Sequence, residues 1–279
     1  MSDLHSSDHS SDKSPLGQTV SYDAAYDPTL LFAIPRRDGR ASLGLDSLPF
    51  TGGDIWNAYE LSWLNPRGKP VVAWGEFWVP ADSPNIIESK SFKLYLNSLN
   101  QHRFDDVDVV TQTLRRDLSA CAGAAIEVTL RLPEQWSEFP LREPVGICLD
   151  TLDVDIAAYT PQPEWLRTQS TEIVCRQLYS RLLRSRCPVT GQPDWGAVSV
   201  AYTGPEIDPV GLLAYIVSFR QHQDFHEQCV ERMFSDIQRR CAPQQLTVFA
   251  RYLRRGGLDI NPYRSTEATR PLNSRLFQQ

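Results

Sequence analysis

The sequence predicts an α+β protein made of two similar modules, each an antiparallel sheet with a helix pair on one face. Segments with alternating apolar residues and segments with apolar residues at helical spacing follow one another as strand, strand, helix, helix, strand, strand. This order occurs twice within 279 residues, a length that suits two modules of ordinary size. The two halves share negligible sequence identity, so the repeat is one of architecture only.

The first half begins with two aromatic and β-branched segments separated by Asn65–Gly68, which predicts a β-hairpin with its turn at these residues. A helix is clearest where Val107, Val110, Leu114 and Leu118 form an apolar stripe. The expected elements are strands at 54–65 and 70–80, helices at 88–101 and 106–121, and strands at 125–133 and 143–150.

The second half follows a proline-rich linker at 159–170, and its first segment, 170–185, is ambiguous between helix and strand. The elements expected after it are a strand at 195–204, helices at 208–221 and 224–241, and a strand at 245–257 that ends at paired glycines. We therefore predict a first module over residues 21–155 and a second over residues 156–279.

Residues 1–20 are rich in Ser, Asp and His, which predicts a disordered tail. His5 and His9 could chelate a metal there, but a solvated tail is the commoner outcome for such a segment.

Composition excludes several classes of protein. The chain has 28 basic and 34 acidic residues, a net charge of −6, and the basic residues are scattered, so no direct nucleic-acid binding is expected. No apolar run reaches the length of a membrane span, and the N-terminus lacks the apolar core of a secretion signal. The six cysteines are far apart without a CxxC pair, which predicts reduced thiols in a cytoplasmic protein.

Cys187 opens the turn RCPVTGQPDWG, whose ends are stiffened by Pro188 and Pro193 and which leads to Asp194. A lone cysteine is usually packed in a core, but a polar turn exposes side chains, and Arg186 and two further arginines before it favour the thiolate. Asp194 could simply cap the turn or begin the next strand. The alternative is that the turn brings Asp194 back beside Cys187, so that a nucleophile and a proton donor share one small site.

The segment FHEQC places His226 and Cys229 three residues apart on a helix, and with Cys187 they could suggest zinc. No fourth ligand is evident, so no metal is expected. Asp224 and Glu227 have the spacing of a capping box at a helix start. Glu227 could also accept hydrogen bonds from N–H groups of a ligand, because helix starts often line pockets.

Two further segments have both a structural and a functional interpretation. ESKSFKLYLNS (88–98) is an amphipathic helix whose charged face is expected to be solvated. Its predicted inward residues are Phe92, Leu96 and Leu99, and its predicted outward residues are Lys90, Lys93 and Asn97.

Arg254 and Arg255 precede Gly256 and Gly257, a pattern that permits close backbone approach and bidentate phosphate contacts. A bulged strand end explains these glycines equally well. No G-x-G-x-x-G follows a strand, and no Walker or HExxH motif is present, so none of these motifs indicates a nucleotide or zinc site.

Together, four segments resemble one family, the NADPH-dependent 7-cyano-7-deazaguanine reductases, or QueF nitrile reductases. They are ESKSFKLY (88–95), CPVTGQPDW (187–195), FHEQCVER (225–232) and RRGGLDINP (254–262). The resemblance extends from about Asp54 to the C-terminus. It implies two tandem tunnelling-fold modules, the reduction of the nitrile to the primary amine 7-aminomethyl-7-deazaguanine with two NADPH in queuosine biosynthesis for tRNA modification, and a homodimer.

The resemblance also implies residue roles. Cys187 would form a covalent thioimide with the nitrile carbon, and Asp194 would protonate the nitrile nitrogen. The implied deazaguanine-binding residues are Ile87, Glu88, Ser89, His226 and Glu227. The implied NADPH-binding residues are Ser89, Lys90, Arg255 and Gly256.

Two alternatives remain at the level of sequence. A thiol hydrolase would add the same cysteine to a nitrile or amidine and let water resolve the adduct, but it would leave the phosphate-binding features without a purpose. A non-catalytic purine or pterin binder, or a zinc cyclohydrolase relative, would bind its ligand independently of Cys187.

Overall fold

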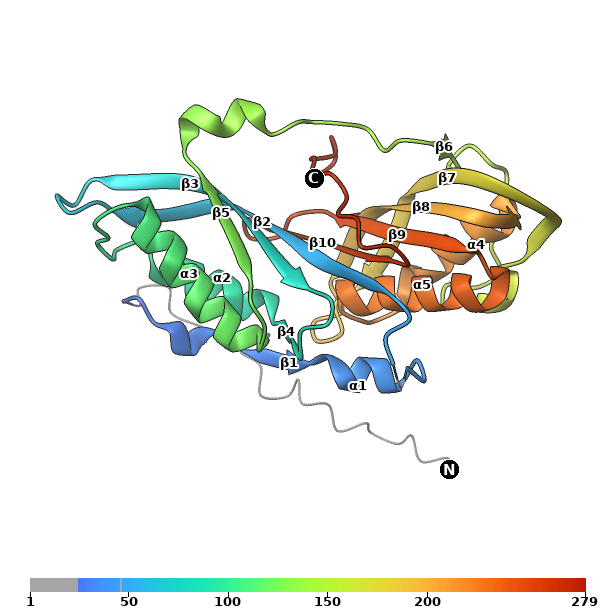
Figure 1. Cartoon of the computed structure of the whole chain (residues 1–279), viewed down its shortest axis with the longest axis horizontal. Coiled ribbons are helices and arrows are strands. Elements are labelled where there is room, and N and C mark those ends of the chain that lie inside the picture. The colour runs from blue at the N-terminus through green and yellow to red at the C-terminus, as the bar shows by residue number, and fades with distance from the viewer. Residues whose placement is uncertain (1–24, 46) are drawn as a thin grey trace.

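The computed structural model describes residues 25–45 and 47–279 (Figure 1). The predicted tail at 1–20, with His5 and His9, lies outside the described residues.

Most strands belong to one sheet with the order β5-β3-β2-β10-β9-β8-β7-β6 (Figure 1). The first module contributes β2 (Thr51–Leu64), β3 (Pro70–Pro80), α2 (Ser89–Ser98), α3 (Val107–Ala122) and β5 (Glu127–Arg131). The second contributes β7 (Thr168–Arg186), β8 (Pro193–Ile207), α4 (Pro209–Ser218), α5 (His226–Cys241), β9 (Gln245–Tyr252) and β10 (Leu258–Ser265). The predicted α+β class, with largely antiparallel strands and a helix pair packed on each half, is confirmed.

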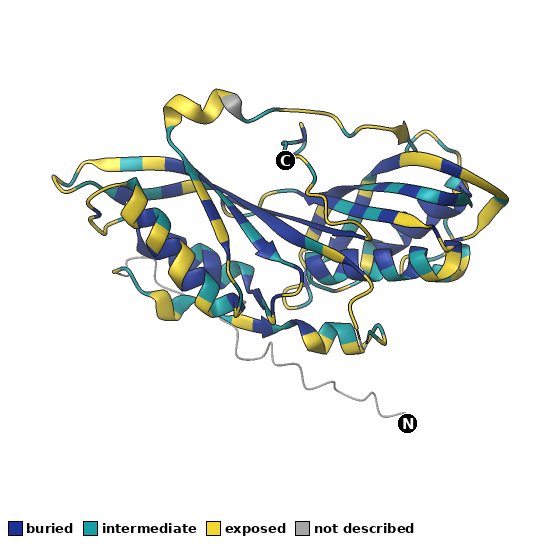
Figure 2. Cartoon of the chain, viewed as in Figure 1, coloured by how far each residue is buried: buried dark blue, intermediate teal, exposed yellow. Residues whose placement is uncertain are grey.

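The two halves are joined edge to edge rather than forming separate sheets. Strand β10 pairs with β2 from Leu258↔Ala58 to Ser265↔Thr51, so the last strand of the second module lies beside a long strand of the first. Each half keeps its own core: Phe92 and Leu114 pack in the first, and Leu213 and Phe234 in the second. Figure 2 shows the buried residues on the helix faces that meet the sheet, with exposed residues on the outer sides.

The helices begin and end where capping chemistry requires. The Asp106 carboxylate accepts a hydrogen bond from Val109 N (2.9 Å) at the start of α3, and Gly123 ends that helix with a φ of 72°. The apolar stripe predicted for α3 is confirmed, because Val110, Leu114 and Leu118 are buried.

The predicted strand at 143–150 is wrong. Only β6 (Ile147–Cys148) is extended there, and it pairs in parallel with β7 of the second module instead of joining the first. Pro140 and Pro144 offer no N–H to a sheet ladder, and the chain turns at Gly146 with a φ of 113°. The boundary between residues 155 and 156 falls in the connection between β5 and β7 and stays a prediction.

Two other expectations are refined. The ambiguous segment 170–185 is a strand, since β7 pairs with β8 along most of its length. The strand predicted at 245–257 ends at Tyr252, and Gly256 and Gly257 form the turn into β10, where their φ angles of 56° and 77° suit glycine.

An N-terminal segment that the sequence did not predict contacts both modules. It contains β1 (Ala33–Pro35), which pairs with β4 (Asn85–Ile87), and the short helix α1 (Arg36–Ala41), which packs on α5. Among the described residues, no helix is long and apolar enough to cross a membrane.

Candidate active site

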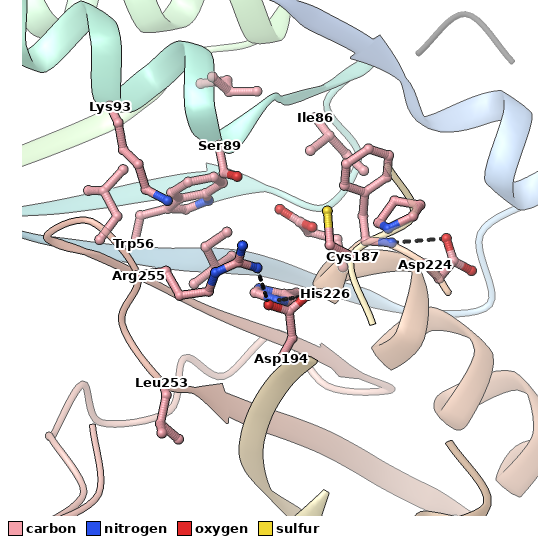
Figure 3. Close-up of a pocket in the computed structure, with 16 residues that line it drawn as sticks. Trp56, Ile86, Ser89, Lys93, Cys187, Asp194, Asp224, His226, Leu253 and Arg255 are labelled. Carbon is pink, nitrogen blue, oxygen red and sulfur yellow. Dashed lines mark hydrogen bonds and ion pairs between the residues drawn. The ribbon is translucent and has the colours of Figure 1, made fainter. Parts of the chain in front are cut away.

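A cleft lies between the two modules (Figure 3). Its lining residues from the first module are Trp56, Ile86, Ile87, Ser89 and Lys93, and those from the second are Cys187, Pro188, Asp194, Asp224, Phe225, His226, Glu227, Leu253, Arg255, Leu258 and Ile260. Of the predicted site residues, Cys187, Asp194, Ile87, Ser89, His226, Glu227 and Arg255 therefore share one cavity.

The β7–β8 hairpin brings Cys187 and Asp194 to the same face. Asp194 pairs with Ser185, and Cys187 follows Ser185 by two residues, so the alternation of a strand places all three side chains on one side. The turn is closed by hydrogen bonds from Cys187 N to Gln192 O (2.9 Å) and from Gly191 N to Cys187 O (3.0 Å). Cys187 is only 7% exposed and opens into the cleft rather than to bulk solvent.

Asp194 is held as a carboxylate. Burial by itself would raise its pKa, but the hydrogen bond and charge of His226 together with the charge of Arg255 reverse this and hold the pKa below its usual value. The Asp194 oxygens lie 3.3 Å from His226 Nε2 and 2.5 Å from Arg255 Nη1 (Figure 3). In this state Asp194 accepts a proton rather than donating one.

His226 is fixed by stacking as well as by Asp194. Its ring lies parallel to the ring of Tyr252, with the centroids 3.8 Å apart and an interplanar angle of 6°. Its Nδ1 atom is buried and has no hydrogen-bond partner among the described residues, which leaves its hydrogen-bonding capacity unused.

Glu227 has the opposite electrostatic character to Asp194. Burial raises its pKa to about 8, helped by the charge of Asp54, so the carboxyl is mostly protonated at neutral pH. Its Oε1 atom is buried and has no hydrogen-bond partner in the described part of the chain, although the side chain lines the cleft. The predicted capping box at Asp224 and Glu227 is wrong by one residue: Gln228 Oε1 accepts from Phe225 N (3.3 Å), which leaves the Glu227 carboxyl for the pocket.

Positive charge gathers at the first-module end of the cleft, where Lys93 and Arg255 face the cavity (Figure 3). Burial lowers the pKa of Lys93, and the charge of Arg255 adds to this effect. A Cβ atom at Gly256 would lie 3.1 Å from Lys93 Cδ, so the glycine leaves room for the lysine stem. The expectation that Lys93 points outward is wrong, because it lies at the pocket with Ser89, one turn before it.

Comparison with known proteins identifies the family. A model described as "Nitrile reductase, 7-cyano-7-deazaguanine-reductase N-term" matches residues 22–130, and one described as "QueF-like protein" matches residues 193–271. The NADPH-dependent 7-cyano-7-deazaguanine reductase of Azoarcus sp. (strain BH72) is 56% identical over 269 residues, which covers 96% of this chain and 95% of the relative. The enzyme of the same name from Chromobacterium violaceum is 57% identical over 254 residues, or 90% and 91% of the two chains.

The chain belongs to this reductase family. Among solved structures, the archaeosine synthase QueF-Like in the apo form aligns with 36% of this chain and all of its own, at 18% identity and a TM-score of 0.31.

Three predicted site residues of this family member do not line the cleft. Glu88 is buried, and its carboxylate caps α2 by accepting hydrogen bonds from Lys90 N (2.8 Å) and Ser91 N (2.7 Å). Lys90 and Gly256 each lie beside a lining residue, Ser89 and Arg255 respectively. Their assigned contacts stay predictions.

The zinc alternative has no geometric support within the described part of the chain. No group of three or more His, Cys, Asp or Glu side chains is arranged for a metal there. Cys229 is fully buried in the second core, and burial raises the pKa of its thiol well above the usual value.

Sequence reasoning missed several lining residues. Trp56, Leu258 and Ile260 come from β2 and β10, which lie side by side only in the folded chain, so no local pattern marks them. The position of Lys93 could have been found from the sequence, because Ser89 and Lys93 are four residues apart and therefore lie on one face of a helix.

Proposed function

We propose that this chain reduces the nitrile of 7-cyano-7-deazaguanine to 7-aminomethyl-7-deazaguanine with NADPH, by way of a thioimide on Cys187. The observation that supports this most strongly is the contents of one cleft. A thiol, an ionised carboxylate and an unpartnered, protonated carboxyl lie there beside two cationic side chains.

The first step uses the ionised state of Asp194. The Cys187 thiol gives its proton to the Asp194 carboxylate, and the sulfur forms a bond to the nitrile carbon. Asp194, now protonated, gives that proton to the nitrile nitrogen. The S–H proton therefore ends on nitrogen, one C–N π bond becomes a C–S bond, and Asp194 returns to its original carboxylate form with His226 and Arg255 as partners.

NADPH supplies the two hydrides that convert the thioimide carbon first to a thiohemiaminal and then, after the thiol leaves, from imine to amine. Lys93 and Arg255 suit its phosphate groups because both are cationic, and Gly256 leaves room for the Lys93 stem beside Arg255. Ser89 and Lys90, at the start of α2, are the further residues proposed to hold it. Enclosure in the cleft between modules keeps the imine from water.

The N–H edge of the substrate ring is proposed to bind to Glu227 and His226. A guanine-like ring presents N–H donors, and Glu227 Oε1 is a buried acceptor without a partner. Ile87 and Ser89 would contact the ring from the first module, and Glu88 would act by fixing the start of α2 that carries them.

We further propose a cytoplasmic homodimer with the module boundary near residue 155, acting in queuosine biosynthesis without binding nucleic acid directly. A second copy suits the face of the sheet where Val145 and Leu272, 70% and 59% exposed, line a groove with Phe249.

The decisive experiment follows NADPH absorbance on addition of 7-cyano-7-deazaguanine. Wild type should consume two NADPH per nitrile, and Cys187→Ala should consume none. Cys175→Ala is the matched control, because Cys175 is an exposed thiol on β7, away from the cleft, and should retain full turnover. Consumption of the nitrile without NADPH loss would instead indicate the hydrolase, in which water resolves the thioimide.

A further inference from the structure

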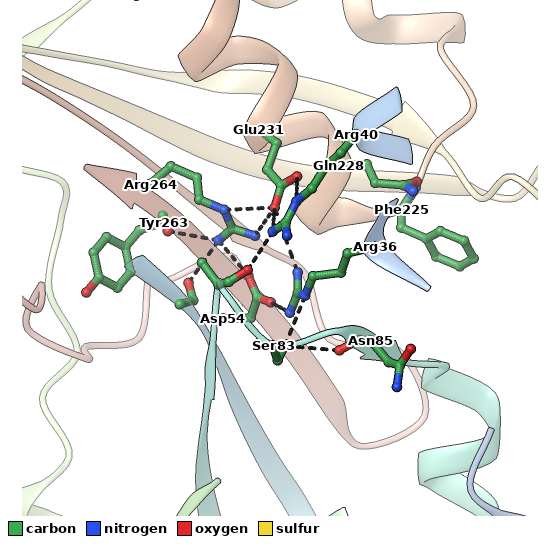
Figure 4. A network of polar contacts seen from close by, with 12 residues as sticks. Arg36, Arg40, Asp54, Ser83, Asn85, Phe225, Gln228, Glu231, Tyr263 and Arg264 are labelled. Atoms are coloured by element: carbon green, nitrogen blue, oxygen red, sulfur yellow. Dashed lines mark hydrogen bonds and ion pairs between the residues drawn. The ribbon is translucent and has the colours of Figure 1, made fainter. Parts of the chain in front are cut away.

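One helical turn along α5 from Glu227 lies a buried cluster of charged side chains that the proposed reaction does not use (Figure 4). It contains the guanidinium groups of Arg36, Arg40 and Arg264 and the carboxylates of Asp54 and Glu231. These side chains come from α1, β10, β2 and α5, so the cluster connects the N-terminal segment, both modules and the helix that carries Glu227.

The cluster is tightly bonded. Asp54 lies between two arginines, with its oxygens 2.5 Å from Arg36 Nη2 and 2.8 Å from Arg264 Nη1. Glu231 Oε1 lies 2.8 Å from both Arg40 Nη2 and Arg264 Nη2. Arg40 is 11% exposed at its side chain, and the other four side chains are 2% exposed or less.

The charges within this cluster do not balance. Although burial opposes ionisation, the neighbouring arginines hold the pKa values of Asp54 and Glu231 below their usual range, so both are anions. Three cations then face two anions, and a buried surplus charge is costly unless a counter-charge is near. Arg36 Nη1 is itself buried, lies 3.8 Å from Glu231 Oε1, and has no hydrogen-bond partner among the residues that the structure describes.

Glu227 is the group that can supply the missing anion. It lies one turn before Glu231 on α5, and the charges of Asp54, Arg36 and Arg264 all act on it. The other charged or titratable groups near it are His226 and Glu231 on its own helix, Asp224 just before that helix, Asp194 on β8, Cys187 in the turn, Lys93 on α2, and Arg255 before β10.

We propose that Arg36 is a positioning residue for Glu227, and that the surplus positive charge of this cluster lets Glu227 ionise when a ligand that donates N–H groups fills the pocket. The inference rests on the proposed function, because it assumes a guanine-like edge at Glu227. In the free protein Glu227 holds a proton, and ligand binding releases that proton to solvent. The resulting carboxylate accepts the ligand N–H groups in front and is balanced by the cluster behind.

The first test measures proton release in a Cys187→Ala background, where the nitrile binds without forming a covalent bond. Calorimetry of 7-cyano-7-deazaguanine binding at pH 7, in buffers of different ionisation heat, should show nearly one proton released. The release should vanish when Glu227 is also changed to Gln. Tight binding without proton release would overturn the inference while leaving the nitrile reductase function intact.

The second test separates a charge effect from structural damage. Arg36→Met removes a cation and should move the pH midpoint of Glu227 upward, whereas Asp54→Asn removes an anion and should move it downward. The affinity at pH 7 should change about tenfold for each unit by which the bound-state midpoint moves. Arg37→Met is the matched control, because the Arg37 side chain is 87% exposed on the same helix and should move nothing.

A readout without ligand keeps this test independent of the proposed substrate. The infrared difference spectrum between wild type and Glu227→Gln should contain the C=O stretching band of a protonated carboxyl at pH 7. That band should disappear as the pH rises through about 8. Its midpoint should shift in opposite directions in Arg36→Met and Asp54→Asn. Midpoint shifts in the same direction in the two variants, or no shift in either, would overturn the role of Arg36. This outcome does not depend on whether the nitrile binds.

Discussion

The two modules place the same elements in the same order, yet the cleft takes different parts from each. Helices α2 and α4 both have ten residues, with an acidic N-cap, Glu88 or Asp208, and a tyrosine at the seventh position. The Tyr95 hydroxyl donates to Asp117 (2.7 Å) on α3, and Tyr215 donates to Asp236 (2.8 Å) on α5. Each module also has a hairpin turn closed by a backbone hydrogen bond of 2.9 Å. Asn65 N donates to Lys69 O in the first module, and Cys187 N donates to Gln192 O in the second.

The differences lie at the positions that face the cleft. The first two residues of α3 are Val107 and Asp108, whereas α5 begins with His226 and Glu227. The fifth residue is Lys93 in α2, which faces the cleft, and Leu213 in α4, which packs in the core. A common scaffold therefore presents Cys187, Asp194, His226, Glu227 and Arg255 to the cleft from the second module, and Lys93 from the first.

The largest expected effect is a loss of kcat, and it is expected at the β7–β8 turn but not at the β2–β3 turn. Asp194→Ala should lower kcat by roughly 10²–10⁴-fold, because the proton relay between thiol and nitrile is lost. NADPH oxidation by the purified variant, with circular dichroism to show that the fold survives, measures this.

At the equivalent turn, Asn65→Ala should leave kcat unchanged and lower only the melting temperature. Asn65 Oδ1 accepts hydrogen bonds from Arg67 N and Lys69 N, both at 3.0 Å, which is a structural task. Normal turnover in Asp194→Ala would remove Asp194 from the mechanism.

An intermediate effect is expected at the fifth residue of α2 and α4, which is Lys93 in the first module and Leu213 in the second. Lys93→Leu should lower kcat/KM for NADPH by roughly 10–100-fold, the equivalent of losing a charged hydrogen bond of about 1.5–3 kcal/mol. Burial lowers the pKa of Lys93, so its charged form is disfavoured in the folded state and destabilises the fold most below that pKa. The same variant should therefore melt at an equal or higher temperature at neutral pH.

The reciprocal change provides the control. Leu213→Lys places a charge in the second core, where Leu213 is 3% exposed, and should destabilise the protein by several kcal/mol, on the order expected for an unpaired buried charge. If Lys93→Leu keeps its kcat/KM, the positive end of the cleft does not serve the cofactor.

The smallest expected effect concerns how the second helix of each module ends. Gly123 ends α3 with a φ of 72°, whereas Ala242 ends α5 with a φ of 46°, a left-handed conformation that disfavours a Cβ. Ala242→Gly should raise the free energy of unfolding by about 1 kcal/mol in urea denaturation, without affecting turnover.

Gly123→Ala should lower stability by a similar amount, since it adds the strain that Ala242 already bears. A destabilised Ala242→Gly variant would mean that the entropy of the unfolded chain outweighs that strain.

Much of the fold was predictable because its signals are local. The apolar stripe at Val110, Leu114 and Leu118 needs only the helical period, and the hairpin at Asn65 needs only turn chemistry. The failure at 143–150 has a clear cause: its apolar residues resemble a strand, but pairing depends on a partner edge, and within the described residues Ile147 and Cys148 pair with β7 alone.

The candidate site divides in the same way. The sequence alone determined which residue types were available for chemistry, because Cys187, Asp194, His226 and Glu227 lie in short motifs that also carry the family resemblance. Only the tertiary structure decided their electrostatic states. Asp194 is an anion because His226 and Arg255, which are distant in sequence, both contact it. Glu227 is protonated because burial and the distant Asp54 act on it. Lys93 faces the cleft, where its stem lies beside Gly256 in the turn before β10. Charge interactions depend on distance and burial, which the order of residues along a chain does not specify.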